Sequence, residues 1–118
     1  MSIPESGVGR ILCRAEEIPE GGGRGFQIPA EPFPRRIFVV RHEGVLYGYD
    51  NTCPHAGSPL DFMPDRFFDP TGTRLQCATH GAQFRVHDGY CVAGPCAGKS
   101  LRPVAVAVSD GYVTVKGA

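Results

Sequence analysis

Residues 53–60 read Cys-Pro-His-Ala-Gly-Ser-Pro-Leu and residues 77–84 read Cys-Ala-Thr-His-Gly-Ala-Gln-Phe, so each stretch sets a cysteine close to a histidine. The spacing is C-x-H in the first stretch and C-x-x-H in the second, with twenty-one residues between His55 and Cys77. Two thiolates and two imidazoles can form either a closed tetrahedral zinc site or a mixed-ligand iron–sulfur site. The two stretches therefore indicate a metal centre whose type depends on their surroundings.

The composition predicts an all-β protein. The chain has 118 residues, of which 16 are glycine, 11 are proline and 42% are hydrophobic. Long helices do not tolerate so much glycine and proline, whereas short strands joined by many turns do. The length fits one domain with its own core, and we expect a single domain over residues 1–118.

Two predicted hairpins enclose the cysteine and histidine stretches. Strands at 37–41 and 45–50 flank His-Glu-Gly, and strands at 104–108 and 112–115 flank Ser-Asp-Gly, which are turn sequences. Upstream we expect a short strand near 10–16, a flexible glycine-rich turn at 21–26 and an irregular segment at 28–34. The prediction is an antiparallel β-sandwich base with an inserted cluster-binding subdomain at about residues 51–103.

The balanced charge and the lack of recognisable targeting segments argue against several function classes. Twelve basic and twelve acidic side chains give a net charge of zero without a basic run, so nucleic acid is not an expected partner. No segment approaches the roughly 20 apolar residues that span a membrane, and the first residues do not form a secretory signal. We expect a soluble, cytoplasmic protein that uses at least two of its five cysteines as metal ligands rather than in disulfides.

The two stretches resemble the cluster-binding loops of Rieske-type [2Fe-2S] proteins, most closely those of small Rieske ferredoxins. Asp88-Gly89 and Gly94-Pro95 resemble the downstream turn and the proline loop of that family, and the resemblance extends over about residues 37–115. It implies one Rieske-type [2Fe-2S] cluster as the cofactor. One iron would be bound by Cys53 and Cys77, and the other iron by His55 and His80 with their Nε2–H groups toward a partner.

The reduction potential follows from what the two stretches lack. Ser58 and Thr79 stand where high-potential Rieske proteins carry a loop-bridging disulfide, and Ala82 and Phe84 stand where those proteins carry hydroxyl donors. Without these donors the reduced cluster is stabilised less. We therefore predict a potential at the low end of the range of roughly −150 to +300 mV of Rieske centres.

The same cysteines and histidines could also serve other kinds of site. Structural zinc usually has C-x2-4-C spacing, which the first stretch lacks, and a catalytic Cys–His pair has no orienting third group. Cys91 and Cys96 are close enough in sequence for a disulfide or a redox switch, but in a reducing compartment we expect free, partly buried thiols.

Further features are predicted both outside the ligand stretches and within them. Cys13 is expected in the core, and His42 and His87 are expected to be exposed to solvent. The segment 61–76 is expected to form an extended hairpin with a turn at 69–72, whose two phenylalanines, at 67 and 68, pack near the base. Gly57 and Gly81, beside the histidines, either bring N–H groups to the cluster sulfurs or are ordinary turn glycines.

The predicted function is one-electron transfer by the ferredoxin component of an oxygenase system. The resemblance implies a flavin reductase upstream and a terminal oxygenase downstream. The chain lacks a 2-His-1-carboxylate unit, so we expect an electron-transport component and not an enzyme by itself. The alternatives are the small Rieske subunit of an assimilatory nitrite reductase and a regulatory protein that senses oxidants through Cys91 and Cys96.

Overall fold

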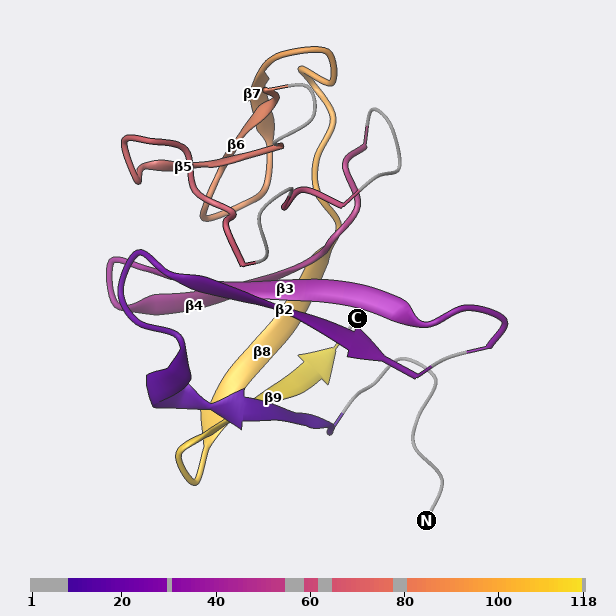
Figure 1. The fold of residues 1–118 in the computed structure, drawn as a ribbon, viewed down its shortest axis with the longest axis vertical. Coiled ribbons are helices and arrows are strands. Elements are labelled where there is room, and N and C mark those ends of the chain that lie inside the picture. Colours follow the sequence, from indigo (N-terminus) through magenta and orange to yellow (C-terminus); the bar gives the residue numbers. More distant parts are fainter. Residues whose placement is uncertain (1–8, 30, 55–58, 62–64, 78–80, 118) are drawn as a thin grey trace.

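The computed structural model describes residues 9–29, 31–54, 59–61, 65–77 and 81–117. Its strands form two antiparallel sheets (Figure 1). The larger sheet has the order β1-β9-β8-β4-β3-β2 and the smaller sheet the order β5-β6-β7. The larger sheet contains β1 (Ile11–Arg14), β2 (Gly23–Ile28), β3 (Arg35–His42), β4 (Val45–Asp50), β8 (Pro103–Ser109) and β9 (Tyr112–Gly117). The smaller sheet contains β5 (Arg74–Gln76), β6 (Gln83–Arg85) and β7 (Cys91–Ala93), and one 3-10 turn, η1 (Ala15–Glu17), follows β1.

Both predicted hairpins are present. The β3–β4 turn is made by Glu43 and Gly44, with φ values of 52° and 78°, and the β8–β9 turn by Asp110 and Gly111, with φ values of 53° and 81°. Two successive residues with positive φ form the turn whose twist matches that of the flanking strands. The registers His42↔Val45 and Ser109↔Tyr112 confirm that each loop has two residues.

The prediction of a flexible turn over residues 21–26 is wrong for most of its length, because β2 begins at Gly23 and pairs with β3. A Cβ atom on Gly23 would lie 2.8 Å from Cγ1 of Val40 and 2.9 Å from Cδ2 of Phe67. This glycine lets another segment pack closely on the strand, a use that composition does not distinguish from a turn. Gly21 alone has the positive φ of a turn glycine.

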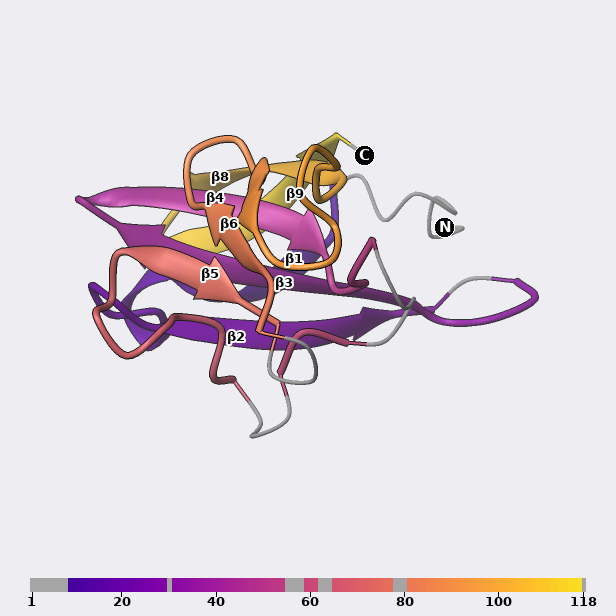
Figure 2. The same cartoon turned by 90° about the horizontal axis from the view of Figure 1, so that it is seen from above.

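Strand β3 is buried on both faces, because Ile37, Phe38, Val39 and Val40 are all fully buried. Side chains alternate across a strand. Ile37 and Val39 pack into the interior of the larger sheet, with residues of β1, β2, β8 and β9. Phe38 and Val40 face the other way, toward the smaller sheet. Figure 1 shows β5–β7 on the side of β3 and β4 that is opposite to β9, and Figure 2 shows the smaller sheet lying across these two strands.

The segment between the two predicted ligand stretches joins the sheets. Phe67 is buried, and its ring stacks on Phe38 with centroids 4.3 Å apart. The turn at 69–72 is present, with the Gly72 N–H donating to the Asp69 carbonyl at 2.9 Å. The structure therefore confirms the all-β class, with an antiparallel base that curls toward a barrel. Within the described ranges, no helix is long and apolar enough to cross a membrane.

Candidate metal centre

Cys53 and Cys77 emerge from different sheets and enter one core. Cys53 lies three residues beyond β4, and Cys77 directly follows β5. Both side chains are fully buried and belong to one hydrophobic cluster with Leu60, Leu75 and Phe84. The structure thus gathers the two predicted thiol ligands. The predicted ligands His55 and His80 lie outside the described residues, as do Gly57, Ser58 and Thr79.

Asn51 closes the loop that carries Cys53. Its side-chain carbonyl accepts the Leu60 N–H at 2.8 Å, and its amide donates to Oδ1 of Asp61 at 3.0 Å. Oδ2 of Asp61 accepts the Asp65 N–H at 3.1 Å, and Oδ1 of Asp65 accepts the N–H of Gly25 in β2 at 2.8 Å. This chain of bonds fixes both ends of the first ligand stretch to the larger sheet.

Backbone bonds close the loop that carries Cys77. The Cys77 N–H donates to the Ala82 carbonyl, and the Gly81 N–H donates to the Cys77 carbonyl, each at 2.8 Å. Gly81 has a φ of 70°, which favours glycine. The N–H of Gly81 is therefore used inside the loop, as the turn-glycine reading predicts.

Ala82 and Phe84 lie on the same side of the chain, two positions apart, and both are fully buried. Gln83, between them, is half-buried and accepts a bond from Arg74. Ala82, just before β6, and Phe84, within β6, both face the core that holds the two cysteines. At these two positions the core therefore has apolar side chains and no hydroxyl group.

Cys91 and Cys96 border the same core. Each is 1% exposed, and their Sγ atoms are 3.1 Å apart without a disulfide bond. Burial and hydrogen bonding with Cys91 raise the pKa of the Cys96 thiol to about 12. The two thiols are not joined in this structure, and both are buried more deeply than the partial burial that the sequence predicted. Cys13 is buried in a different cluster, as predicted.

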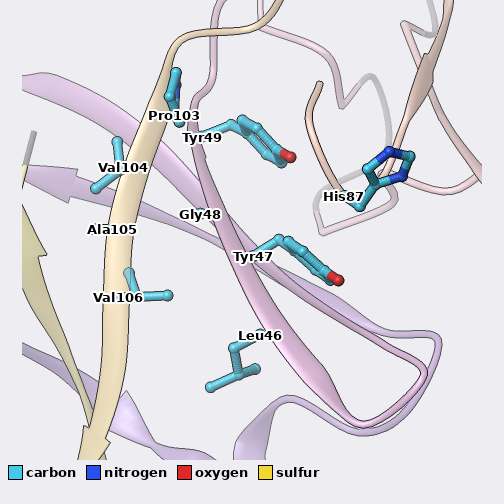
Figure 3. A pocket seen from close by; sticks show the side chains of 9 residues that line it. All are labelled: Leu46, Tyr47, Gly48, Tyr49, His87, Pro103, Val104, Ala105 and Val106. Atoms are coloured by element: carbon cyan, nitrogen blue, oxygen red, sulfur yellow. The ribbon is translucent and has the colours of Figure 1, made fainter. Parts of the chain in front are cut away.

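A buried tyrosine ties β4 to the smaller sheet. The Tyr49 hydroxyl donates to the carbonyl of Val86, just after β6, at 2.5 Å. Burial raises the pKa of Tyr49, followed by the charge of Asp88. Figure 3 shows Tyr47 and Tyr49 on one side of β4, directed toward the side where His87 lies, and these three residues line a surface groove together with other residues of β4 and β8.

The turn after β6 is held by charge. Arg85 and Asp88 form an ion pair at 2.5 Å, and the Arg85 guanidinium lies 4.8 Å from the centre of the Tyr90 ring. The Arg85 hydrogen bond and the Tyr90 N–H lower the pKa of Asp88. The His87 side chain is 65% exposed, as predicted. That of His42 is only 23% exposed, because its ring packs 6.0 Å from that of Phe68, which corrects the prediction of solvent exposure.

The described residues fit an iron–sulfur group. Both cysteines are withheld from water in an apolar core, on two loops that separate backbone networks hold in place. Gly94 lies against the second loop so closely that a Cβ atom would come within 2.7 Å of the Ala82 Cα. No group of three or more metal-binding side chains occurs among the residues that the structure describes, and the two predicted histidine ligands are outside them.

The fold and these buried thiols are those of an iron–sulfur electron carrier. Residues 10–110 match the family model described as the Rieske [2Fe-2S] domain. The chain belongs to the Rieske [2Fe-2S] domain family, and its cofactor is a Rieske-type [2Fe-2S] cluster.

Solved structures give the same assignment. The ferredoxin of Sphingomonas yanoikuyae B1 is similar at 25% identity and TM-score 0.70, over 93% of this chain and 99% of that one. A complex of reduced oxygenase and oxidized ferredoxin in carbazole 1,9a-dioxygenase contains a chain with 25% identity and TM-score 0.74, over 94% of both chains. The carbazole 1,9a-dioxygenase ferredoxin of Nocardioides aromaticivorans IC177 shares the fold at 22% identity and TM-score 0.71, over 94% of this chain and 99% of that one. No curated protein sequence was found to match. The resemblance to Rieske ferredoxins is therefore confirmed, and the chain is an electron carrier similar to those of dioxygenase systems.

Sequence reasoning did not identify Asn51 or Tyr49 as parts of the site. An asparagine two positions before a predicted ligand is a signal that could have been used, because asparagine side chains commonly bond nearby backbone groups. Tyr49 carries no comparable local signal, since its hydrogen bond to Val86 joins segments that are distant in the sequence.

Proposed function

We propose that this chain carries single electrons from a flavin reductase to the terminal oxygenase of a ring-hydroxylating system. The observation that carries the proposal is the burial of Cys53 and Cys77 in one core of a Rieske-domain chain that resembles a ferredoxin over 93% of its length. The similar ferredoxin in the oxygenase complex supports the downstream partner. The upstream reductase is the donor that such a carrier needs.

The proposed ligands are Cys53 and Cys77 for one iron and His55 and His80 for the other. When bound, the cluster supplies a one-electron couple at a higher potential than an all-cysteine cluster, since neutral imidazoles replace two thiolates. The chain's own residues keep water from the thiol side, hold the loop of Cys53 through Asn51 and hold the loop of Cys77 through its backbone bonds. We propose that residues 51–103 form the cluster-binding part of a single domain, since β5–β7 lie within that range.

A cytoplasmic location is part of the proposal. It is supported by the proposed use of Cys53 and Cys77 as metal ligands, which is the use of cysteines that a reducing compartment favours over disulfides.

Electron paramagnetic resonance of the dithionite-reduced protein tests the ligand assignment. We expect a rhombic signal with a low average g value, lost in His55→Ser and in His80→Ser. The matched control is His87→Ser, which removes an exposed histidine from a turn and should keep the signal. An unchanged signal in either ligand variant would remove that residue from the ligand set.

Stopped-flow mixing with partners tests the carrier role. The reduced protein should be oxidised by a Rieske-type terminal oxygenase in a single one-electron phase, and a flavin reductase should reduce it again. Stable copurification with a large sirohaem subunit, without electron transfer to an oxygenase, would contradict the oxygenase assignment and support the nitrite reductase alternative.

A further inference from the structure

Cys91 and Cys96 are placed to react with each other. Their Sγ atoms are 3.1 Å apart, and an S–S bond is about 2.05 Å long, so a movement of about 1 Å would join them. Both side chains are buried, and Sγ of Cys91 also lies 3.2 Å from the carbonyl oxygen of Ala93. The two thiols are therefore already in contact in the folded protein, close to the distance at which a disulfide forms.

The backbone around the pair holds this geometry. The Cys91 N–H donates to the Lys99 carbonyl at 2.8 Å, and the Gly98 N–H donates to the Cys91 carbonyl at 3.2 Å. The Lys99 N–H donates to the Cys96 carbonyl at 2.9 Å. These bonds close the segment 91–99 on itself, so its ends are together before any sulfur bond forms. The cost of closing the loop has therefore been met by the backbone.

The pair also touches both predicted ligand loops. Gly94, between the two cysteines, packs against Ala82 in the loop of Cys77. The Cys96 thiol is within hydrogen-bonding reach of Cys53. Pro95 and Ala97, on either side of Cys96, are exposed, so the segment that carries Cys96 lies at the protein surface. A change in the pair would act on the packing of both loops.

We propose that Cys91 and Cys96 form a reversible dithiol–disulfide pair, a second redox site of this protein that is oxidised by a peroxide. One sulfur attacks a peroxide oxygen, so that an S–O bond forms, the O–O bond breaks and water leaves. The second sulfur then attacks the first, so that the S–S bond forms, the S–O bond breaks and a second water leaves. The two sulfurs give up two electrons in total, the peroxide accepts both, and the two thiol protons end in the two waters. A dithiol reductant reverses the change and is itself oxidised to a disulfide.

The proposed reaction of Cys91 with Cys96 does not depend on which redox partners the protein has. The experiment that tests it uses the cluster-loaded protein. Trypsin cleavage after arginine and lysine places Cys91 and Cys96 together in the peptide 86–99. The other cysteines fall into the peptides 11–14, 42–66 and 75–85. An internal disulfide therefore lowers the mass of one peptide by two hydrogen atoms, whereas a bond to Cys53 or Cys77 joins two peptides.

The protein is treated with one equivalent of hydrogen peroxide, alkylated and digested, while its visible spectrum reports the cluster. We expect peptide 86–99 to lose two hydrogen atoms and to resist alkylation, and to take up two alkyl groups after treatment with dithiothreitol. Full alkylation of both cysteines after peroxide, or their appearance as sulfinic acids that dithiothreitol does not reverse, would overturn the proposal.

Single variants supply the controls. Cys91→Ser and Cys96→Ser should each abolish the reversible loss of two hydrogen atoms from this peptide. Cys13→Ser, which changes a buried cysteine in a separate core cluster, should leave it intact. Because the decisive measurement is made on the unmodified chain, it stands even where a variant does not fold. The joining of peptide 86–99 to peptide 42–66 or 75–85 in the unmodified chain, in place of the internal loss of two hydrogen atoms, would show that another cysteine is the partner and would also overturn the proposal.

Discussion

Introducing hydroxyl groups beside the buried cysteines should raise the reduction potential. Ala82 and Phe84 are fully buried and share one core with Cys53 and Cys77. In Ala82→Ser or Phe84→Tyr the new hydroxyl could donate a hydrogen bond to a negatively charged sulfur of the site. Because reduction adds one negative charge, this hydrogen bond would stabilise the reduced protein more than the oxidised protein.

The size of the shift follows from the burial of the site. A hydrogen bond to a charged group contributes about 1.5–3 kcal/mol, and water does not screen this core. If about half of the larger figure is differential, the gain is about 1.4 kcal/mol, which corresponds to about 60 mV for a one-electron couple. We expect about 60 mV from each substitution, and about 120 mV from both if their effects are additive.

The assay is a redox titration followed by circular dichroism in the visible range, with Gln83→Ser as the matched control. Gln83 lies between the two positions on the opposite face of β6, so its hydroxyl would not reach the core. The unmodified protein should titrate at the low end of the Rieske range. A midpoint well above about +100 mV before substitution, or equal midpoints for Ala82→Ser, Phe84→Tyr and Gln83→Ser in folded proteins, would refute the reasoning.

The remaining predictions concern stability. Asn51→Ala should lower the free energy of unfolding by about 1–3 kcal/mol in urea and speed cluster loss, because it leaves the buried Leu60 N–H without its acceptor; unchanged cluster retention would contradict the loop-closing role. Phe67→Ala should cost about 3–5 kcal/mol in the same assay, because its ring stacks on Phe38 between the sheets, and a loss below about 1 kcal/mol would mean that the segment is not part of the core. Tyr49→Phe should cost about 1 kcal/mol at neutral pH. Burial raises the pKa of Tyr49, so the unfolded chain releases the phenol proton at a lower pH than the folded protein does. The stability of the unmodified protein should therefore fall as the pH rises above about 10. Thermal unfolding at several pH values should show a less steep fall for Tyr49→Phe.

The hairpins were predictable because their signals are local. Gly44 and Gly111 readily adopt the positive φ of a two-residue turn, and the strands on either side of them are short runs rich in β-branched and aromatic residues, so a few adjacent residues determine the turn and the register. The strand at Gly23–Ile28 was not predictable in this way. Its glycine-rich sequence makes room for Phe67, forty-four positions away in the chain, and a residue's own neighbours do not report such a contact.

In the candidate site, too, the residues with local sequence signals were predictable and those with distant contacts were not. The spacing around Cys53 and Cys77 made both cysteines identifiable, because metal ligands on one loop must be close in sequence. The residues that position them act across the fold. Tyr49 bonds Val86, and the Asn51 network reaches Gly25 through Asp61 and Asp65. Their roles depend on how the two sheets pack against each other. That packing involves residues of both sheets at once, so no single stretch of sequence predicts it.

The two proposed thiol ligands belong to separate supports, and this has a consequence for electron transfer. Cys53 is held by Asn51 to the larger sheet, whereas Cys77 is held by Ala82 to the smaller one. The relative position of the two sulfurs therefore depends on the contacts between the sheets, above all the Phe38–Phe67 stack and the Tyr49 hydrogen bond. A carrier that exchanges electrons quickly needs ligands that move little when its charge changes. Residues at the junction of the two sheets therefore contribute to the rigidity of the site together with the ligand loops themselves.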